Sequence, residues 1–180
     1  MYRFASAYEM ETTVFGAARP GYKRDRVMQW ISFMQERKIN RVCCLLSASH
    51  LSRYSNLLDT YRGKFGDSRV CWTPIDDFQL VERSTLIKII LPFLIDTQQN
   101  QERVVIHCSG GVGRTGQILA AWLVAQRSFS NRDAIATVLR TGRNPYEAVI
   151  AGIFKGHLPW ITVQKFHVLL DDCRATFCLN

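Results

Sequence analysis

The sequence predicts an α/β fold with a mostly parallel central sheet flanked by helices on both faces. Short β-branched runs, such as Val104–Ile106, alternate along the chain with longer segments of helical periodicity. This alternation favours crossover connections, which make strands parallel and bury both faces of their sheet. The chain has 180 residues, 47% of them hydrophobic, and no linker or repeat divides it. We therefore expect a single domain over residues 1–180.

The N-terminal half is predicted to supply three strands and two helices. The strands are expected at residues 12–16, 41–46 and 69–73. The first helix is expected at residues 25–37, where apolar residues such as Trp30 and Met34 recur near helical spacing. The second is expected at residues 51–65 and is closed by Gly66.

The C-terminal half is predicted to be largely helical around one central strand, Val104–Ile106. The expected helices are residues 82–98, with a kink at Pro92, and residues 114–127, 131–140 and 162–173. The longest apolar run, Ile118–Ala125, is much shorter than the roughly 18 residues that cross a bilayer. It therefore predicts a buried helix, and we expect no membrane association.

The most informative segment follows the central strand and reads His-Cys-Ser-Gly-Gly-Val-Gly-Arg-Thr-Gly over residues 107–116. Its place between a strand and a helix makes backbone N–H groups converge at a helix N-terminus, a geometry that binds a phosphate-like anion. The glycines allow the loop to close around a tetrahedral group. The segment lacks the Gly-Lys-Ser/Thr ending of a nucleotide-binding loop.

Each polar residue of this segment suits phosphate chemistry. Arg114 can grip two phosphate oxygens with its planar fork, and its charge favours the thiolate form of Cys108. The Thr115 hydroxyl is placed to donate to that thiolate, and His107 to orient the loop. A cysteine nucleophile also needs a general acid for the departing oxygen, and the adjacent Asp76 and Asp77 are the candidates.

These residues resemble the cysteine-dependent protein tyrosine phosphatases, whose signature HCxxGxxR[ST]G is matched at every fixed position. The segment Thr73-Pro74-Ile75-Asp76-Asp77-Phe78 is similar to the Pro-Ile-x-Asp segment of the dual-specificity branch. The order of elements from about residue 12 to 173 also fits that branch. The chain looks most like the compact dual-specificity-like phosphatases of bacteria and archaea.

The resemblance implies a phosphocysteine mechanism with Cys108 as nucleophile and Asp77, which has the family's spacing, as general acid. Asp76 is the alternative acid, or a cap of the local turn. Arg114 and the loop N–H groups would hold the phosphoryl oxygens, the loop residues being Ser109, Gly110, Gly111, Val112 and Gly113. No metal and no organic cofactor is implied.

The expected activity is hydrolysis of phosphomonoesters, foremost phosphotyrosine and also phosphoserine or phosphothreonine, in proteins. The alternatives are a phosphatase for a phosphoinositide or an RNA 5′ end, and an inactive phosphate-binding module. The absence of lysine from the variable loop positions disfavours a polyphosphorylated lipid. A sulfurtransferase or arsenate reductase would share a Cys-to-Arg loop but not the whole signature.

Charge and cysteine usage give further expectations. The net charge is +8, but the basic residues are spread along the chain, so we expect phosphorylated protein substrates rather than nucleic acid. The six cysteines show no paired CxxC spacing, and residues 1–10 contain no apolar stretch. Both features predict a cytoplasmic protein without a zinc site. Cys43 and Cys44 are expected to face opposite sides of a strand as core residues, one of them a candidate for a disulfide with Cys108.

Three further residues have open roles. Arg143 is either a support of the phosphate loop, a substrate contact or a solvent-facing residue. Arg19 is a candidate for the substrate cleft, and Gln164 is expected to be an exposed helical residue. The sequence does not indicate the physiological substrate or the oligomeric state.

Overall fold

The computed structural model describes residues 2–147 and 159–177. Within these residues a five-stranded sheet has the order β1-β2-β5-β3-β4. Its strands are β1 (Ala5–Ser6), β2 (Val14–Ala18), β3 (Arg41–Cys44), β4 (Val70–Trp72) and β5 (Val104–Cys108). Neighbouring strands are parallel except β1 and β2, which are antiparallel. The mostly parallel sheet expected from the sequence is therefore confirmed.

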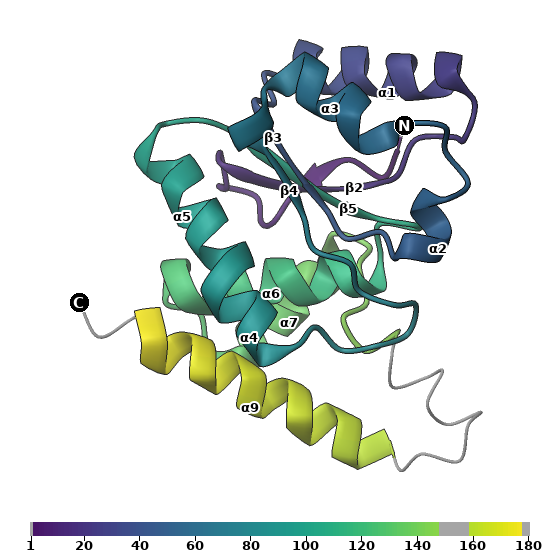
Figure 1. Cartoon of the computed structure of the whole chain (residues 1–180). Coiled ribbons are helices and arrows are strands. Elements are labelled where there is room, and N and C mark those ends of the chain that lie inside the picture. Colours follow the sequence, from purple (N-terminus) through teal and green to yellow (C-terminus); the bar gives the residue numbers. More distant parts are fainter. Residues whose placement is uncertain (1, 148–158, 178–180) are drawn as a thin grey trace.

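Helices cover both faces of the sheet, as predicted (Figure 1). One face carries α1 (Arg24–Glu36) and α3 (Leu57–Phe65). The other face carries α5 (Leu91–Gln99), α6 (Gly113–Arg127), α7 (Asn131–Arg140) and α9 (Pro159–Phe177). The short helices α2 (Ala48–Leu51) and α4 (Arg83–Thr85) belong to the connections.

Side-chain alternation along the strands divides the core into two clusters. Cys44 of β3 packs with Trp30 and Tyr61 between the sheet and helices α1 and α3. Its neighbour Cys43 packs in the cluster that includes the apolar side chains of α6. The two cysteines therefore face opposite sides of the sheet, as the two-residue period of a strand requires.

Cys43 has a thiol partner on the neighbouring strand. It pairs in register with Cys71 of β4, and a hydrogen bond with Cys71, together with burial, raises the pKa of Cys43 well above its ordinary value. Burial raises the pKa of Cys44 to about 12. Both thiols therefore stay protonated at neutral pH, and neither is a strong nucleophile.

Helix α6 is buried along almost its whole length. Every residue from Gly113 to Ala125 is buried, and the helix packs against strands β2 and β5 and helices α7 and α9. Its segment Ile118–Ala125 is apolar on all sides, as expected of a helix in a core. In the described part of the chain, no helix has the length and apolar character to cross a membrane.

The helix predicted over residues 51–65 is confirmed for Leu57–Phe65, with Gly66 after its end, but is wrong for the segment between α2 and α3, which is not helical. This segment, residues 52–56, is rich in serine and asparagine, which favour turns over helix interiors. Its Tyr54 is buried and donates from its hydroxyl to the Pro20 carbonyl at 2.8 Å. The weak helix preference of these residues and the contact of Tyr54 with Pro20 both favour a turn over a continuous helix.

Other boundaries also differ from the expectation. Strand β2 begins and ends two residues later than predicted, and the short strand β1 was missed. Between α4 and α5 the chain forms a π-helical turn, Leu86–Ile90, directly before the turn that contains Pro92. Proline lacks an N–H group and crowds the carbonyl four residues earlier, so the irregularity expected at Pro92 falls in the preceding turn.

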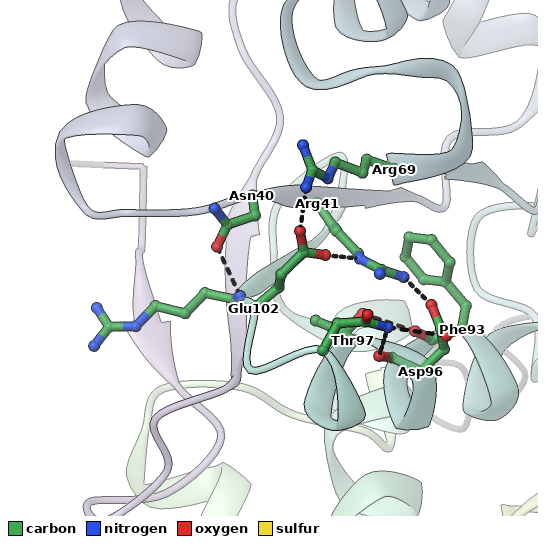
Figure 2. A network of polar contacts seen from close by, with 9 residues as sticks. Asn40, Arg41, Arg69, Phe93, Asp96, Thr97 and Glu102 are labelled. Carbon is green, nitrogen blue, oxygen red and sulfur yellow. Dashed lines mark hydrogen bonds and ion pairs between the residues drawn. The ribbon is translucent and has the colours of Figure 1, made fainter.

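A buried cation fixes the end of the sheet opposite the 107–116 loop. Arg41, at the start of β3, contacts the carboxylates of Glu102 and Asp96, and Glu102 also pairs with Arg69 (Figure 2). Burial alone would lower the pKa of Arg41, but its hydrogen bonds with Asp96 and Glu102 raise it. The network joins β3 to helix α5 and to the turn that leads into β5.

Replacing Glu102 by Gln should lower the free energy of unfolding at pH 7 by about 1–3 kcal/mol, because it leaves the Arg41 cation without its more buried partner. Burial raises the pKa of Glu102, but Arg41 and Arg69 lower it by more. The stabilising contribution is therefore present above pH about 4 and is lost as pH falls through the lowered folded-state pKa. Urea unfolding of both proteins at several pH values measures this, and a difference that grows below pH 4 would contradict it.

Candidate active site

The 107–116 loop lies where strand β5 ends and helix α6 begins. β5 is paired with β2 through Cys108, its last residue, and with β3 through His107, so both neighbours hold this end of the strand. The Arg19 N–H donates to the Cys108 carbonyl at 3.0 Å. Gly111 has φ of 70°, and a Cβ there would lie 2.5 Å from the Ala17 carbonyl carbon. Only glycine fits this close approach of the loop to β2.

The Cys108 side chain is buried and faces the first turn of α6. Its Sγ accepts a hydrogen bond from Thr115 Oγ1 at 3.2 Å. A hydroxyl donor at this position stabilises negative charge on sulfur. The structure thus brings Cys108 and Thr115 together, as the sequence predicted.

Arg114 connects the loop with the segment that contains the two candidate acids. Its Nη1 donates to the Ile75 carbonyl at 2.7 Å, and its Nη2 forms an ion pair with Asp77. The Asp77 side chain is 40% exposed, so it is open to a bound substrate. Asp76 is also exposed, and its carbonyl accepts from Gln79 N–H at 3.2 Å in a tight turn. The geometry places Asp77, rather than Asp76, beside the loop arginine.

His107 is fully buried beneath the loop. Its Nε2 shares a hydrogen bond of 3.2 Å with the Tyr61 hydroxyl, and its ring packs edge-on against Trp30. Burial lowers the pKa of His107 to about 3, so the ring is neutral at physiological pH. His107 therefore ties the end of β5 to helices α1 and α3 as an uncharged group.

Two residues near the loop were not found from the sequence. His50 Nε2, from α2, lies 3.3 Å from Asp77 Oδ2, and its Nδ1 lies 2.8 Å from Ser47 Oγ. Glu147 Oε2 accepts the Gly113 N–H at 2.9 Å, from 34 residues further along the chain. No local pattern assigns either residue its partner at the site, because each depends on a tertiary contact. The sequence predicted loop N–H groups that are open to phosphoryl oxygens, but the Gly113 N–H already donates to the Glu147 carboxylate.

Arg143 is a buried support of the sheet and not a solvent-facing residue. Its Nη2 donates to the carbonyls of Gly16 at 2.7 Å and Arg3 at 2.8 Å, and burial lowers its pKa to about 10. A Cβ on Gly16 would lie 2.6 Å from Arg143 Nε, so glycine is required there. Arg143 thus joins β2, which contacts the loop at Gly111, to the segment after α7.

Arg19 packs against aromatic residues, whereas Gln164 lies exposed on a helix. The Arg19 guanidinium is half-buried, donates to Pro20 O and Tyr54 Oη, and lies 3.8 Å from the centre of the Tyr22 ring. Gln164 is exposed on α9, as expected. Among residues 2–147 and 159–177, no cluster of three or more His, Cys, Asp or Glu side chains is arranged to hold a metal ion.

A phosphate-binding turn with a cysteine, an arginine and a carboxylate at the edge of a parallel sheet is typical of cysteine-dependent phosphatases. The chain belongs to the dual specificity phosphatase family, since the model of that catalytic domain matches residues 27–151. This confirms the resemblance seen in the sequence to the compact dual-specificity-like phosphatases.

Among curated proteins, 123R of Invertebrate iridescent virus 6, named as a tyrosine phosphatase, is similar. It is 23% identical over 77 residues, which make up 43% of this chain and 54% of that protein. The chain thus matches only about half the length of this relative.

Several solved structures share the fold. Tk-PTP in its active form has a TM-score of 0.66 and 23% identity, with 89% of this chain and 95% of that chain covered. TpbA of P. aeruginosa, in complex with pTyr, has a TM-score of 0.61 and 15% identity, covering 99% and 92%. PTPMT1 in complex with PI(5)P has a TM-score of 0.69 and 14% identity, covering 96% and 97%.

The Glu147 carboxylate gives a test of the loop's electrostatics. Glu147→Gln keeps an oxygen acceptor for the Gly113 N–H but removes a negative charge beside the anion site. Vanadate should then inhibit at about 3- to 10-fold lower concentration, because like-charge repulsion is relieved. The exposed Glu36→Gln on α1 is the matched control and should change nothing. An unchanged or higher inhibition constant for folded Glu147→Gln contradicts the prediction.

Proposed function

We propose that this protein hydrolyses phosphomonoesters of phosphorylated proteins, foremost phosphotyrosine and also phosphoserine and phosphothreonine, through a phosphocysteine intermediate. The observation that carries the proposal is the joint contact of Arg114 with Asp77 and of Thr115 with Cys108. Nucleophile, anion-binding fork and acid are thereby held together at the start of one helix. The similarity to TpbA, solved with pTyr, supports the choice of phosphotyrosine.

In the first proposed step, Cys108 Sγ attacks the phosphorus atom as a thiolate. The S–P bond forms while the P–O bond to the leaving group breaks, and Asp77 supplies a proton to the departing oxygen. The loop N–H groups and the Arg114 fork stabilise the oxygens of the phosphoryl group in flight. A bound phosphoryl group competes with Asp77 for the Arg114 guanidinium, because both present oxygen acceptors to it.

In the second proposed step, the oxygen of a water molecule bonds to phosphorus while the S–P bond of the phosphocysteine breaks, which releases inorganic phosphate and the Cys108 thiolate. The Asp77 carboxylate takes a proton from the attacking water, which restores the acid for the next cycle. The hydrogen bond from Thr115 stabilises the thiolate as it leaves phosphorus.

A phosphoinositide phosphatase is the second candidate, because PTPMT1 has been solved with PI(5)P on the same fold. In this chain the variable loop positions hold no lysine to bind a second phosphate, which favours the single phosphoryl group of a modified protein side chain.

We propose the reducing cytoplasm as the compartment of this protein. The proposal is supported by the free thiols of the five described cysteines, Cys43, Cys44, Cys71, Cys108 and Cys173.

A substrate panel tests the proposal. We expect release of phosphate from matched phosphotyrosine and phosphoserine peptides, with phosphotyrosine at least as fast because a phenoxide leaves more easily than an alkoxide. Cys108→Ser should abolish turnover, since a hydroxyl is a far weaker acid than a thiol and does not supply the anionic nucleophile. The expected activity persists in excess chelator. Hydrolysis of PI(5)P vesicles with none of the peptides, or activity in Cys108→Ser, would contradict it.

The roles of Asp76 and Asp77 can be distinguished by how the hydrolysis rate of each variant depends on the leaving group. Asp77→Asn should slow hydrolysis of phenyl phosphate by roughly 10²–10⁴-fold, the usual cost of losing a general acid, and affect an activated aryl phosphate far less. Asp76→Asn is the matched control and should have a small effect, because Asp76 is exposed and the ion pair with Arg114 is formed by Asp77. Steady-state rates over a series of aryl phosphates measure both. A larger, leaving-group-dependent loss in Asp76→Asn would exchange their roles.

A further inference from the structure

Gln117 is a buried amide in an otherwise apolar stretch of α6. It lies one turn after Arg114 and is only 1% exposed. Both ends of its carboxamide bond to the same loop. Oε1 accepts the Val81 N–H at 3.0 Å, and Nε2 donates to the Gln79 carbonyl at 3.2 Å. A buried amide is stable only when its polar atoms are paired, so these two bonds explain its presence.

The bonded segment follows directly after the proposed acid. Asp77 occupies the tight turn closed by the Gln79 N–H and the Asp76 carbonyl. Within this turn Phe78 is in the left-handed region, with φ of 62°, and is 51% exposed. The turn is therefore held in an unusual backbone conformation while its tip faces outward, so contacts at its two ends must fix its position.

Helix α6 supplies both end contacts. Before the turn, Arg114 donates to the Ile75 carbonyl at 2.7 Å. After it, Gln117 binds Gln79 and Val81. Arg114 and Gln117 are three residues apart, so they lie on the same face of the helix. The helix that begins at the phosphate-binding loop thus grips the Asp77 turn from both ends.

We propose that Gln117 is a positioning residue that holds the Asp77 carboxyl at the leaving-group oxygen. This inference rests on the proposed function, in which Asp77 is the general acid. Proton transfer needs the acid within hydrogen-bond reach of the departing oxygen, and a small displacement is costly. Binding of the phosphoryl group depends on the loop and Arg114 instead. Loss of Gln117 should therefore weaken proton donation and leave anion binding intact.

Gln117→Met tests the proposal, because methionine has a similar length and suits a buried helix but forms neither bond. We expect kcat for phenyl phosphate to fall about 10- to 100-fold, and kcat for an activated aryl phosphate to fall less than about 3-fold. The inhibition constant of vanadate should stay unchanged. Ile135→Val on α7 is the control for a general loss of core packing and should not alter the leaving-group dependence.

Two further measurements keep the test independent of one variant. Hydrogen exchange at the Val81 amide should be faster in Gln117→Met, because its acceptor is gone. Gln117→Glu retains an acceptor for Val81 but sets a carboxylate oxygen against the Gln79 carbonyl. We expect its leaving-group dependence to lie between those of the wild type and Gln117→Met, and it carries the test if Gln117→Met does not fold.

The outcomes separate this inference from the proposed function. If Asp77→Asn leaves the leaving-group dependence unchanged, the acid assignment fails whatever Gln117 does. If Asp77→Asn makes the rate depend more steeply on the leaving group, while folded Gln117 variants show the same dependence as the wild type, only the positioning role of Gln117 is overturned. A uniform loss with all substrates, or a weaker binding of vanadate, also overturns it, because either marks a merely structural residue.

Discussion

The burial of the Arg114 guanidinium is the constraint on which the site depends. A buried cation is costly unless it is paired and hydrogen-bonded. The Ile75 carbonyl and the Asp77 carboxylate meet this requirement, and both come from the connection after β4. Pairing the cation therefore draws the Asp77 turn against the first turn of α6, next to Cys108.

The rest of the fold holds that first turn in place. β5 is central, and its end is held by the pairing of Cys108 with Ala18 of β2 and of the preceding His107 with Cys44 of β3. His107 anchors the same strand end to the opposite helical layer as a neutral ring. Gly111 lets the loop pass against β2, and Arg143 secures β2 from behind through Gly16. Interactions on both faces of the sheet thus fix one short loop.

The part of the site that is local in sequence was predictable, and the part made by tertiary contacts was not. Cys108, Arg114 and Thr115 occupy fixed positions in one strand-to-helix turn, and Asp77 follows a recognisable Pro-Ile segment. His50, Gln117 and Glu147 have no local signature, because their partners lie 27 to 38 residues away. The same distinction applies to the fold. Alternating strands and helices predicted the parallel sheet, whereas the break at Tyr54 follows from its contact with Pro20.

The covalent intermediate is the most direct test of the central claim that phosphorus is transferred to Cys108. The enzyme is mixed with an activated aryl phosphate, denatured within one turnover and digested. The masses of the resulting peptides are then measured by mass spectrometry. We predict one added phosphoryl group on the peptide containing Cys108, at a higher level in Asp77→Asn, which lacks the base for the second step. Full turnover with Cys108 unmodified in both proteins throughout the time course would contradict the mechanism.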